Sequence, residues 1–401
     1  MRDPNQRRWQ LAVLAGATLF ISAWLGVTPA HDMAPQTPQR MGGGEFVIGH
    51  TDALDSATQA AILDEIARNQ QRLYREGRLA LPRADATVTL AWPLRPQAGF
   101  TDYGYYAVTN FVDHDPAFPD QLRDYENGRR SYDTGGGYNH AGTDYVLWPF
   151  AWLKMADNTV EVIAAADGVI VGKSDGHDDQ NCSLSSSPWN AVYIQHADGT
   201  VAWYGHLQTN SLTAKAIGAA VVTGEYLGLV GSSGSSTTPH LHFEVRNQNG
   251  LGSEPVDPYA GPGNPQLAAS LWNNQPAYYD PAIVHLGAGV AAPVFPDCPQ
   301  QENPNEQELF NRGDEVYLSA YYRDQRQGQV SELRVVRPDG TEHAAWTHAS
   351  AAPHYAVSYW WWTITLPNNA PAGEWRFQAT FEGKTYERSF FAVTRLSLIH
   401  I

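Results

Sequence analysis

Two histidines stand two positions apart in segment 237–246, which follows a Gly/Ser-rich loop and then alternates polar with apolar residues. Such alternation is typical of a half-buried β-strand, in which side chains two apart point to the same face. His240, His242 and Glu244 therefore share one face of the predicted strand. Packing explains two neighbouring imidazoles poorly, whereas coordination of a metal ion explains them well. The pattern indicates a metal site.

A second pair of candidate ligands lies upstream, where His140 and Asp144 enter another predicted strand across a glycine-containing turn. At this spacing the two side chains can present one nitrogen and one oxygen to the same point. With one histidine of segment 237–246 they supply two nitrogens and one carboxylate oxygen. Catalytic zinc sites keep three protein ligands and a fourth position for water, whose pKa the zinc lowers. The pair alone would suit an ordinary loop, so the hypothesis depends on the combination.

A third element ends in His206, which follows Trp-Tyr-Gly at the end of a predicted strand. If three ligands suffice, His206 and one of His240 or His242 remain near the metal without binding it. Neutral imidazoles suit general-base work on water or stabilisation of an oxyanion.

The ordered motifs His-x-x-x-Asp, Tyr-x-His-Leu and His-Leu-His-Phe-Glu-Val resemble those of the lysostaphin/LytM-type zinc endopeptidases of bacterial cell walls. Three connecting stretches are similar too: 165–169, 192–199 and 256–259. In all, the resemblance covers residues 90–261. The ordered set of motifs is specific, whereas no single one of them is.

The resemblance implies that His140, Asp144 and His242 bind zinc. It implies that His206 and His240 are the catalytic histidines, which handle the water and the tetrahedral intermediate. All five positions are occupied, as in an active member of the family. The chain departs from the family pattern in two insertions, 125–138 and 177–188, which would wall the cleft differently and leave the choice of substrate open.

These features predict a secreted zinc-dependent endopeptidase that hydrolyses peptide cross-links of bacterial peptidoglycan, with peptide stems as its partners. The alternative is a catalytically inactive cell-wall-binding or regulatory module of the same fold, against which the five occupied positions argue. A cupin-type metal enzyme is a third hypothesis, but its pattern needs a glutamate beyond Glu244, where Arg246 and Asn247 stand. The bond cleaved stays open between Gly–Gly, D-Ala–diaminopimelate and others.

Other polar residues invite plainer interpretations. His196 is interpreted as a structural histidine or one that supports a ligand. Glu244 could accept a hydrogen bond from a ligand or form a salt bridge at the strand edge. Six further histidines lack ligand spacing and are predicted to lie at the surface: His114, His177, His285, His343, His348 and His354.

The elements that must position these residues are short β runs separated by Gly, Asp and Asn. Long helices do not alternate with them, which argues against a parallel βαβ sheet. The predicted fold class is mainly β: an antiparallel, LytM-like metallopeptidase domain over 87–262, with an N-terminal helix and a C-terminal β-sandwich. Its predicted strands are 87–92, 105–112, 143–147, 160–165, 168–172, 190–196, 201–204, 226–230 and 240–245.

The N-terminal part predicts export. Arginines precede an apolar run and a small-residue exit, which indicates a signal peptide over 1–30; an uncleaved membrane anchor is the alternative. The folded part is therefore expected in the periplasm or outside the cell, with membrane contact only if the segment stays uncleaved. Residues 31–86 predict a tether and an amphipathic helix over 55–78, capped by Asp55 or Ser56.

The C-terminal part predicts a linker over 263–300, which is dense in Pro, Gly and Asn, and a β-sandwich over 301–395. Predicted strands there are 315–322, 330–336, 359–366, 374–381 and 385–393. The three tryptophans 360–362 are interpreted as half core and half surface rather than as a sugar-stacking platform. Residues 396–401 match what a common transposon-derived sequencing adaptor encodes, so we interpret them as an adaptor-derived tail.

Composition limits the partners and the compartment. The 401-residue chain carries a net charge of −16, so it has no basic face for phosphates, which argues against nucleic acid. Cys182 and Cys298 suit an oxidising compartment and could form one disulfide; two free thiols are the alternative. The oligomeric state and the ligand of the C-terminal domain stay open.

Overall fold

The computed structural model describes residues 36–83, 85–247, 253–298 and 300–394. The predicted signal peptide 1–30 and the predicted tail 396–401 lie outside these residues. The described chain is mainly antiparallel β, with helices α1 (Ser56–Arg75) and α2 (Ala151–Ala156). This confirms the predicted fold class and its N-terminal helix. Neither helix combines the length and the apolar character that a membrane crossing requires.

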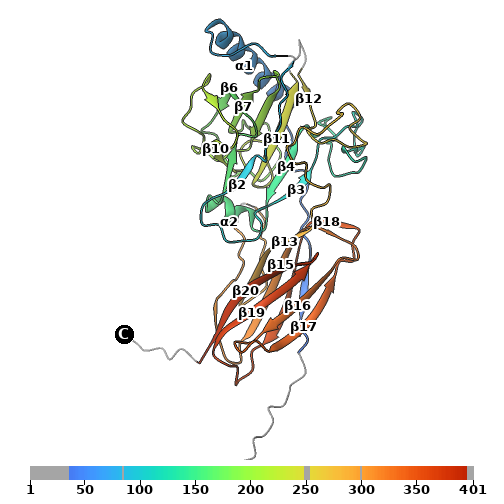
Figure 1. The fold of residues 1–401 in the computed structure, drawn as a ribbon, viewed down its shortest axis with the longest axis vertical. Coiled ribbons are helices and arrows are strands. Elements are labelled where there is room, and N and C mark those ends of the chain that lie inside the picture. The colour runs from blue at the N-terminus through green and yellow to red at the C-terminus, as the bar shows by residue number, and fades with distance from the viewer. Residues whose placement is uncertain (1–35, 84, 248–252, 299, 395–401) are drawn as a thin grey trace, which may run out of the picture. The chain divides into compact units, whose positions relative to one another are not determined.

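The largest sheet has the order β3-β4-β11-β8-β7-β6-β9, and β12 pairs with β11 (Figure 1). Its strands are β3 (Tyr106–Asn110), β4 (Thr143–Leu147), β6 (Gly168–Ser174), β7 (Ala191–Gln195), β8 (Val201–Gly205), β9 (Ala220–Val221), β11 (His240–Asn247) and β12 (Glu254–Pro255). A second sheet consists of β10 (Tyr226–Leu229), β5 (Val160–Ile163) and β2 (Leu94–Pro96). The two sheets enclose the core of the predicted peptidase domain.

Strand β11 separates a core face from a polar face. Leu241, Phe243 and Val245 pack in the hydrophobic core between the two sheets. His240 and His242 point to the opposite face, because successive side chains of a strand alternate. Burial of each apolar side chain stabilises the fold by about 1.5–3 kcal/mol. A slip of one residue would move all three out of the core, so their burial fixes the register that aims the histidines.

Helix α1 covers the histidine-bearing face of the large sheet. Asp55 caps its first turn by accepting hydrogen bonds from the backbone N–H groups of Ala57 and Thr58. Ile66 and Leu73 of the helix are buried against side chains of β6, β7 and β8. The helix predicted over 55–78 is therefore confirmed as Ser56–Arg75 (α1 in Figure 1), and its buried apolar side chains pack on the large sheet.

The C-terminal part is a sandwich of two sheets around one core. One has the order β1-β18-β15-β13 and the other β14-β20-β19-β16-β17. Their strands are β1 (Met41–Glu45), β13 (Ala282–Gly289), β14 (Leu309–Asn311), β15 (Glu315–Arg326), β16 (Val330–Val336), β17 (Glu342–Ala349), β18 (His354–Thr365), β19 (Gly373–Phe381) and β20 (Lys384–Val393). The N-terminal strand β1 thus forms an edge of the C-terminal sandwich.

Several elements differ from the sequence prediction. In segment 87–92 only Leu90 forms an isolated bridge, and the strand begins two residues after the segment, as β2. The predicted linker 263–300 contains β13, and β1 and β17 were not predicted. Glycine is a poor strand former, so the sequence of β1 hides a strand that only the edge of an existing sheet stabilises. The domain boundaries themselves remain predictions.

Tryptophans and histidines of the sandwich test two interpretations of the sequence. Of the three tryptophans, Trp362 is 2% exposed in the core and Trp360 packs against that core, as a half-core interpretation requires. The prediction that His285, His343 and His348 lie at the surface is wrong, because all three are buried. The carboxylate partners of His285, Asp102 and Glu306, are remote from it in the sequence, which therefore gives no spacing signal.

His285 lies between two carboxylates at the junction with the sandwich. Its Nδ1 is 2.7 Å from Asp102 Oδ1, and its Nε2 contacts Glu306. Burial works to raise the pKa of Asp102, but His285 and Lys154 outweigh it and lower the pKa to about 2. This network therefore stabilises the folded chain electrostatically at neutral pH.

Candidate metal centre

The large sheet brings the three predicted ligands to one point. In the antiparallel register His242 of β11 lies opposite Asp144 of β4 on one side and opposite Gly205 of β8 on the other. His140 stands four residues before Asp144, in the loop that enters β4. All three ligand side chains are at most 1% exposed.

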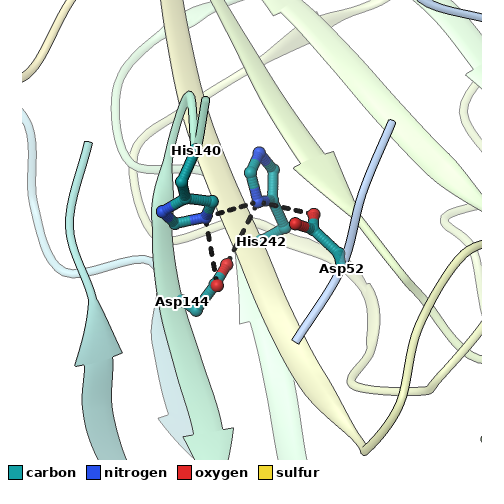
Figure 2. A group of neighbouring side chains, drawn as sticks. All are labelled: Asp52, His140, Asp144 and His242. Carbon is teal, nitrogen blue, oxygen red and sulfur yellow. Dashed lines mark hydrogen bonds and ion pairs between the residues drawn. The ribbon is translucent and has the colours of Figure 1, made fainter. Parts of the chain in front are cut away.

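The distances among the three side chains suit a single small ion. His140 Nε2 lies 3.3 Å from His242 Nδ1 and 3.0 Å from Asp144 Oδ2. His242 Nδ1 lies 3.1 Å from Asp144 Oδ1 (Figure 2). Atoms held tetrahedrally at about 2.0–2.1 Å from a zinc ion stand roughly 3.3–3.4 Å apart. The observed spacing is within a few tenths of an ångström of that value.

Hydrogen bonds behind the imidazoles fix which nitrogens face inward. His140 Nδ1 lies 2.7 Å from the carbonyl oxygen of Phe111, which can only accept, so Nε2 presents its lone pair. His242 Nε2 lies 3.1 Å from Glu244 Oε2, so Nδ1 presents its lone pair. Two lone pairs and a carboxylate that meet in a buried site repel one another unless a cation lies between them. The donor set therefore fits a metal ion, and two imidazoles with one carboxylate suit zinc.

In the absence of a metal ion, protons on the imidazoles balance the negative charge of the carboxylates. Burial works to lower the pKa of His242, but the carboxylates of Asp52 and Asp144 outweigh burial and raise it. Burial also opposes protonation of His140, whose pKa Asp144 raises. Conversely, His140 outweighs burial and lowers the pKa of Asp144. Binding of a metal is therefore expected to release protons from the imidazoles.

The two predicted catalytic histidines lie together beside this cluster. The rings of His206 and His240 have centroids 4.4 Å apart, and both residues are buried. His206 Nδ1 is 2.6 Å from the carbonyl of Ser233, and His240 Nδ1 is 2.8 Å from that of Thr238, so both Nε2 atoms are left for the site. His240 Nε2 has no hydrogen-bond partner among the described residues. Burial, together with His206, lowers the pKa of His240 to about 4.

A second acidic side chain, Asp52, which the sequence analysis missed, reaches the same point from the segment between β1 and α1. Asp52 Oδ2 lies 3.0 Å from His242 Nδ1 (Figure 2). The same oxygen lies 3.0 Å from His206 Nε2. Burial works to raise the pKa of Asp52, but His242 and His206 outweigh it and hold the pKa well below its usual value. A single aspartate in a predicted tether carries no spacing signal that could have revealed it.

Potential ligand atoms fall into two overlapping groups. Those of Asp52, His140, Asp144 and His242 all lie within 4.8 Å of one another, and those of Asp52, His206 and His240 do so as well. The structure thus brings together all five residues predicted for the site and adds Asp52.

Glu244 supports His242 and is itself held by Arg246. One carboxylate oxygen of Glu244 faces His242 Nε2, and the other accepts a hydrogen bond from Arg246 Nε. The guanidinium stacks over Trp203, 4.8 Å from the ring centroid. Burial works to raise the pKa of Glu244, and Arg246 outweighs it and lowers the pKa. The two alternatives for Glu244, ligand support and a salt bridge, are therefore combined.

Gly142, between the two ligands of the first motif, packs directly on β11. A Cβ at this position would lie 2.7 Å from His242 Nε2 and 2.7 Å from the carbonyl oxygen of Phe243. The close approach of the loop to the ligand strand therefore requires glycine.

Both predicted insertions lie beside the site. Tyr132 and Tyr138 of insertion 125–138 direct their hydroxyl groups at Asp52 Oδ1. Cys182 of insertion 177–188 forms a disulfide with Cys298, so the alternative of two free thiols does not hold. The disulfide ties the insertion to the segment that follows β13.

His196, interpreted as structural or ligand-supporting, lies outside both ligand groups, with Nδ1 2.8 Å from the carbonyl oxygen of Asp167.

Known proteins are similar to the part of the chain that carries this site. Residues 140–258 match Peptidase family M23. The DD-carboxypeptidase/endopeptidase Mpg of Neisseria meningitidis is 38% identical over 121 residues, which are 30% of this chain and 22% of that protein. The peptidoglycan DD-endopeptidase ShyC of Vibrio cholerae is 32% identical over 130 residues, which are 32% of this chain and 25% of that protein. The match therefore spans a quarter or less of the length of these relatives.

Among solved structures, the catalytic domain of lysostaphin from Staphylococcus simulans is 27% identical, with a TM-score of 0.24, and the match covers 32% of this chain and 83% of that one. All five residues predicted for the site fall inside the range matched to the family. This part of the chain, residues 140–258, is therefore similar to the peptidases of family M23 and to two proteins that are named endopeptidases.

Proposed function

We propose that this chain is a secreted zinc-dependent endopeptidase that hydrolyses peptide cross-links of bacterial peptidoglycan. The observation that carries the proposal is the convergence of two inward lone pairs, from His140 and His242, on the carboxylate of Asp144. The similarity to Mpg, a DD-carboxypeptidase/endopeptidase, and to ShyC, a peptidoglycan DD-endopeptidase, supports the substrate class. The Cys182–Cys298 disulfide and the predicted signal peptide support export.

The proposed mechanism uses the five residues in distinct roles. His140, Asp144 and His242 would hold zinc, which as a Lewis acid polarises the scissile carbonyl and lowers the pKa of water. His240 is neutral at pH 7 because its pKa is about 4, and its unpartnered Nε2 can accept the proton of the attacking water. His206 Nε2 already faces a carboxylate oxygen of Asp52. In its protonated form it would donate a hydrogen bond to the negative charge that develops on the substrate carbonyl oxygen.

Digestion of purified sacculi of defined cross-link type tests the proposal. Because Asp52 lies against the same ligands, the assay includes the chain and its Asp52→Ala variant, with products identified by mass spectrometry. Muropeptide release should stop after dialysis against a chelator and return with zinc. Release that continues without metal would end the proposal. The product masses also decide which bond is cleaved.

The alternative, an inactive wall-binding or regulatory module of the same fold, is tested by His206→Ala. An inactive module does not need a proton donor, so its cellular effect would survive this substitution. Loss of both the cellular effect and muropeptide release in a folded His206→Ala protein would exclude the alternative.

A further inference from the structure

Trp189, which directly follows insertion 177–188, lies against two histidines of the site. Its indole centroid is 4.9 Å from the ring centroid of His206, with the ring planes 79° apart, and 5.9 Å from that of His242. The mechanism proposed above gives this side chain no role. We propose that Trp189 is a positioning residue, whose indole holds the imidazole of His206 at the angle that the reaction requires. The inference rests on the proposed function, since it concerns the geometry of a proposed catalytic histidine.

The ring of His206 needs a support beyond its hydrogen bonds. Its Nδ1 lies 2.6 Å from the carbonyl oxygen of Ser233, which fixes one atom of the ring. Its other nitrogen, Nε2, which contacts Asp52, is the atom that must meet the substrate. The χ2 torsion of a histidine has broad minima, so one hydrogen bond leaves the plane of the ring to be set by packing.

The indole supplies this packing in an edge-to-face arrangement, which is a preferred geometry of aromatic pairs. In a close-packed interior, a turn of the imidazole about χ2 would either lose this contact or bring the two rings into collision. The contact therefore restricts the one torsion that the hydrogen bond leaves soft. Its loss affects the rate strongly, because a displacement of about 1 Å at a reacting group can lower a rate about 100-fold.

The indole is itself held in place. Trp189 is 4% exposed and belongs to an apolar cluster that includes Tyr193, Trp203 and buried side chains of α1. Its Nε1 donates a hydrogen bond of 2.7 Å to the hydroxyl group of Tyr193. Because both packing and a hydrogen bond fix the indole, it can determine the orientation of a neighbouring ring.

Two glycines leave the space that the indole occupies. A Cβ at Gly205 would overlap the six-membered ring of Trp189, and a Cβ at Gly234 would lie 2.6 Å from the Cβ of Trp189. Gly205 precedes His206 in the chain and lies opposite His242 in the sheet. The indole therefore reaches both histidines through the space that this glycine leaves.

The residue after Trp189 constrains the backbone at the same histidine. His206 has a φ of +60°, in the left-handed region that residues other than glycine seldom adopt. The backbone N–H of Leu207 donates to the carbonyl of Asn190 at 2.9 Å, and Asn190 Nδ2 donates to the carbonyl of Leu207 at 3.1 Å. Residues 189 and 190 thus fix the ring and the backbone of His206 together.

Digestion kinetics with soluble cross-linked muropeptides test the inference in the full zinc-loaded chain. Trp189→Leu keeps an apolar side chain without a flat ring, so kcat should fall about 100-fold while KM stays within about threefold of the parent value. The zinc Kd should also stay within about threefold, because Glu244 still supports His242. Trp189→Phe restores a flat ring and should recover about tenfold of the lost kcat.

Trp272→Phe is the matched control. Trp272 is buried in the core of the predicted peptidase domain, where it packs on Phe243. Phe243 and His242 are neighbours in β11, so their side chains point to opposite faces of the sheet. The control variant should therefore keep kcat within about twofold of the parent value.

Proton NMR gives a readout that does not depend on activity. The Nδ1–H of His206, buried against the carbonyl of Ser233, should give a downfield resonance in the zinc-loaded parent, assigned by its loss in His206→Ala. This resonance should persist in Trp272→Phe and broaden beyond detection in Trp189→Leu. An unchanged resonance in folded Trp189→Leu would overturn the inference, as would a loss of zinc affinity as large as the loss of kcat.

Two further outcomes keep the test decisive. If Trp189→Leu fails to fold, Trp189→Phe, which loses the hydrogen bond to Tyr193, should still lower kcat about tenfold, and an unchanged kcat would overturn the inference. If no form digests muropeptides while the His206 resonance responds as expected, the positioning role stands and the proposed function fails instead.

Discussion

Glu244→Gln tests whether the carboxylate behind His242 contributes to metal binding. Glu244 is 2% exposed and lies 3.1 Å from His242 Nε2. Its charge is maintained by Arg246, which lowers its pKa against the effect of burial. Glutamine keeps the size of the side chain and an oxygen that accepts from Nε2–H, but it removes the negative charge. The variant therefore isolates the electrostatic part of the support.

The magnitude follows from the kind of hydrogen bond that is lost. A hydrogen bond to a charged group contributes about 1.5–3 kcal/mol and a neutral one about 0.5–1.5 kcal/mol. The difference of about 1–1.5 kcal/mol corresponds to a roughly 5–10-fold rise in the zinc Kd. Glu244→Ala removes the support altogether, for which about 10–100-fold is expected. That variant also leaves the buried guanidinium of Arg246 without its carboxylate, so it should lower the stability of the metal-free chain.

Chelator competition at pH 7 measures the zinc Kd, and thermal unfolding of the metal-free protein measures stability. Glu161→Gln is the matched control, because Glu161 of β5 pairs with Arg95 in the second sheet. It should leave the zinc Kd unchanged. If Glu244→Gln binds zinc as tightly as the parent, Glu244 serves only the salt bridge with Arg246, and our account of His242 is refuted. An equal loss in the Glu161 control would show that the effect is not specific to the site.

Three further outcomes are expected. His140→Ala should abolish tight zinc binding in a chelator competition, whereas His206→Ala should keep the zinc Kd within about threefold and lower the hydrolysis rate about 10²–10⁴-fold; equal zinc loss in both would contradict the assigned roles. Asp102→Asn should lower the free energy of unfolding at pH 7 by about 1–2 kcal/mol, since the pKa of Asp102 falls to about 2 on folding. A lowered pKa stabilises the fold above the unfolded value, so the parent's advantage in denaturant titrations should shrink as the pH falls from 4 toward 2. Replacing Cys182 and Cys298 with serine should lower the free energy of unfolding by about 2–4 kcal/mol, read by the same titrations; an unchanged midpoint would show that the disulfide does not contribute to stability.

Local spacing could predict which residues gather at the candidate site, whereas the choice of His242 over His240 as a ligand came from the family resemblance and stays a prediction. In β11 the two-residue repeat alone places His240 and His242 on one face, and the predicted start at residue 240 coincides with that of the strand. Strand β4 also has the predicted bounds, which set Asp144 one residue inside it. Spacing could not predict which ring nitrogen of His140 and of His242 faces the site. The carbonyl of Phe111 and the carboxylate of Glu244 determine this, because each of them contacts the other nitrogen of the ring.

Features that depend on distant partners could not be predicted. Asp52 belongs to the site only because β1 and α1 hold residues 46–54 on either side, and neither contact leaves a periodic pattern around residue 52. The glycine-rich β1 has low strand propensity and forms only against the existing edge of β18. His285 was misplaced at the surface for the same reason, since Asp102 and Glu306 lie far from it in the chain.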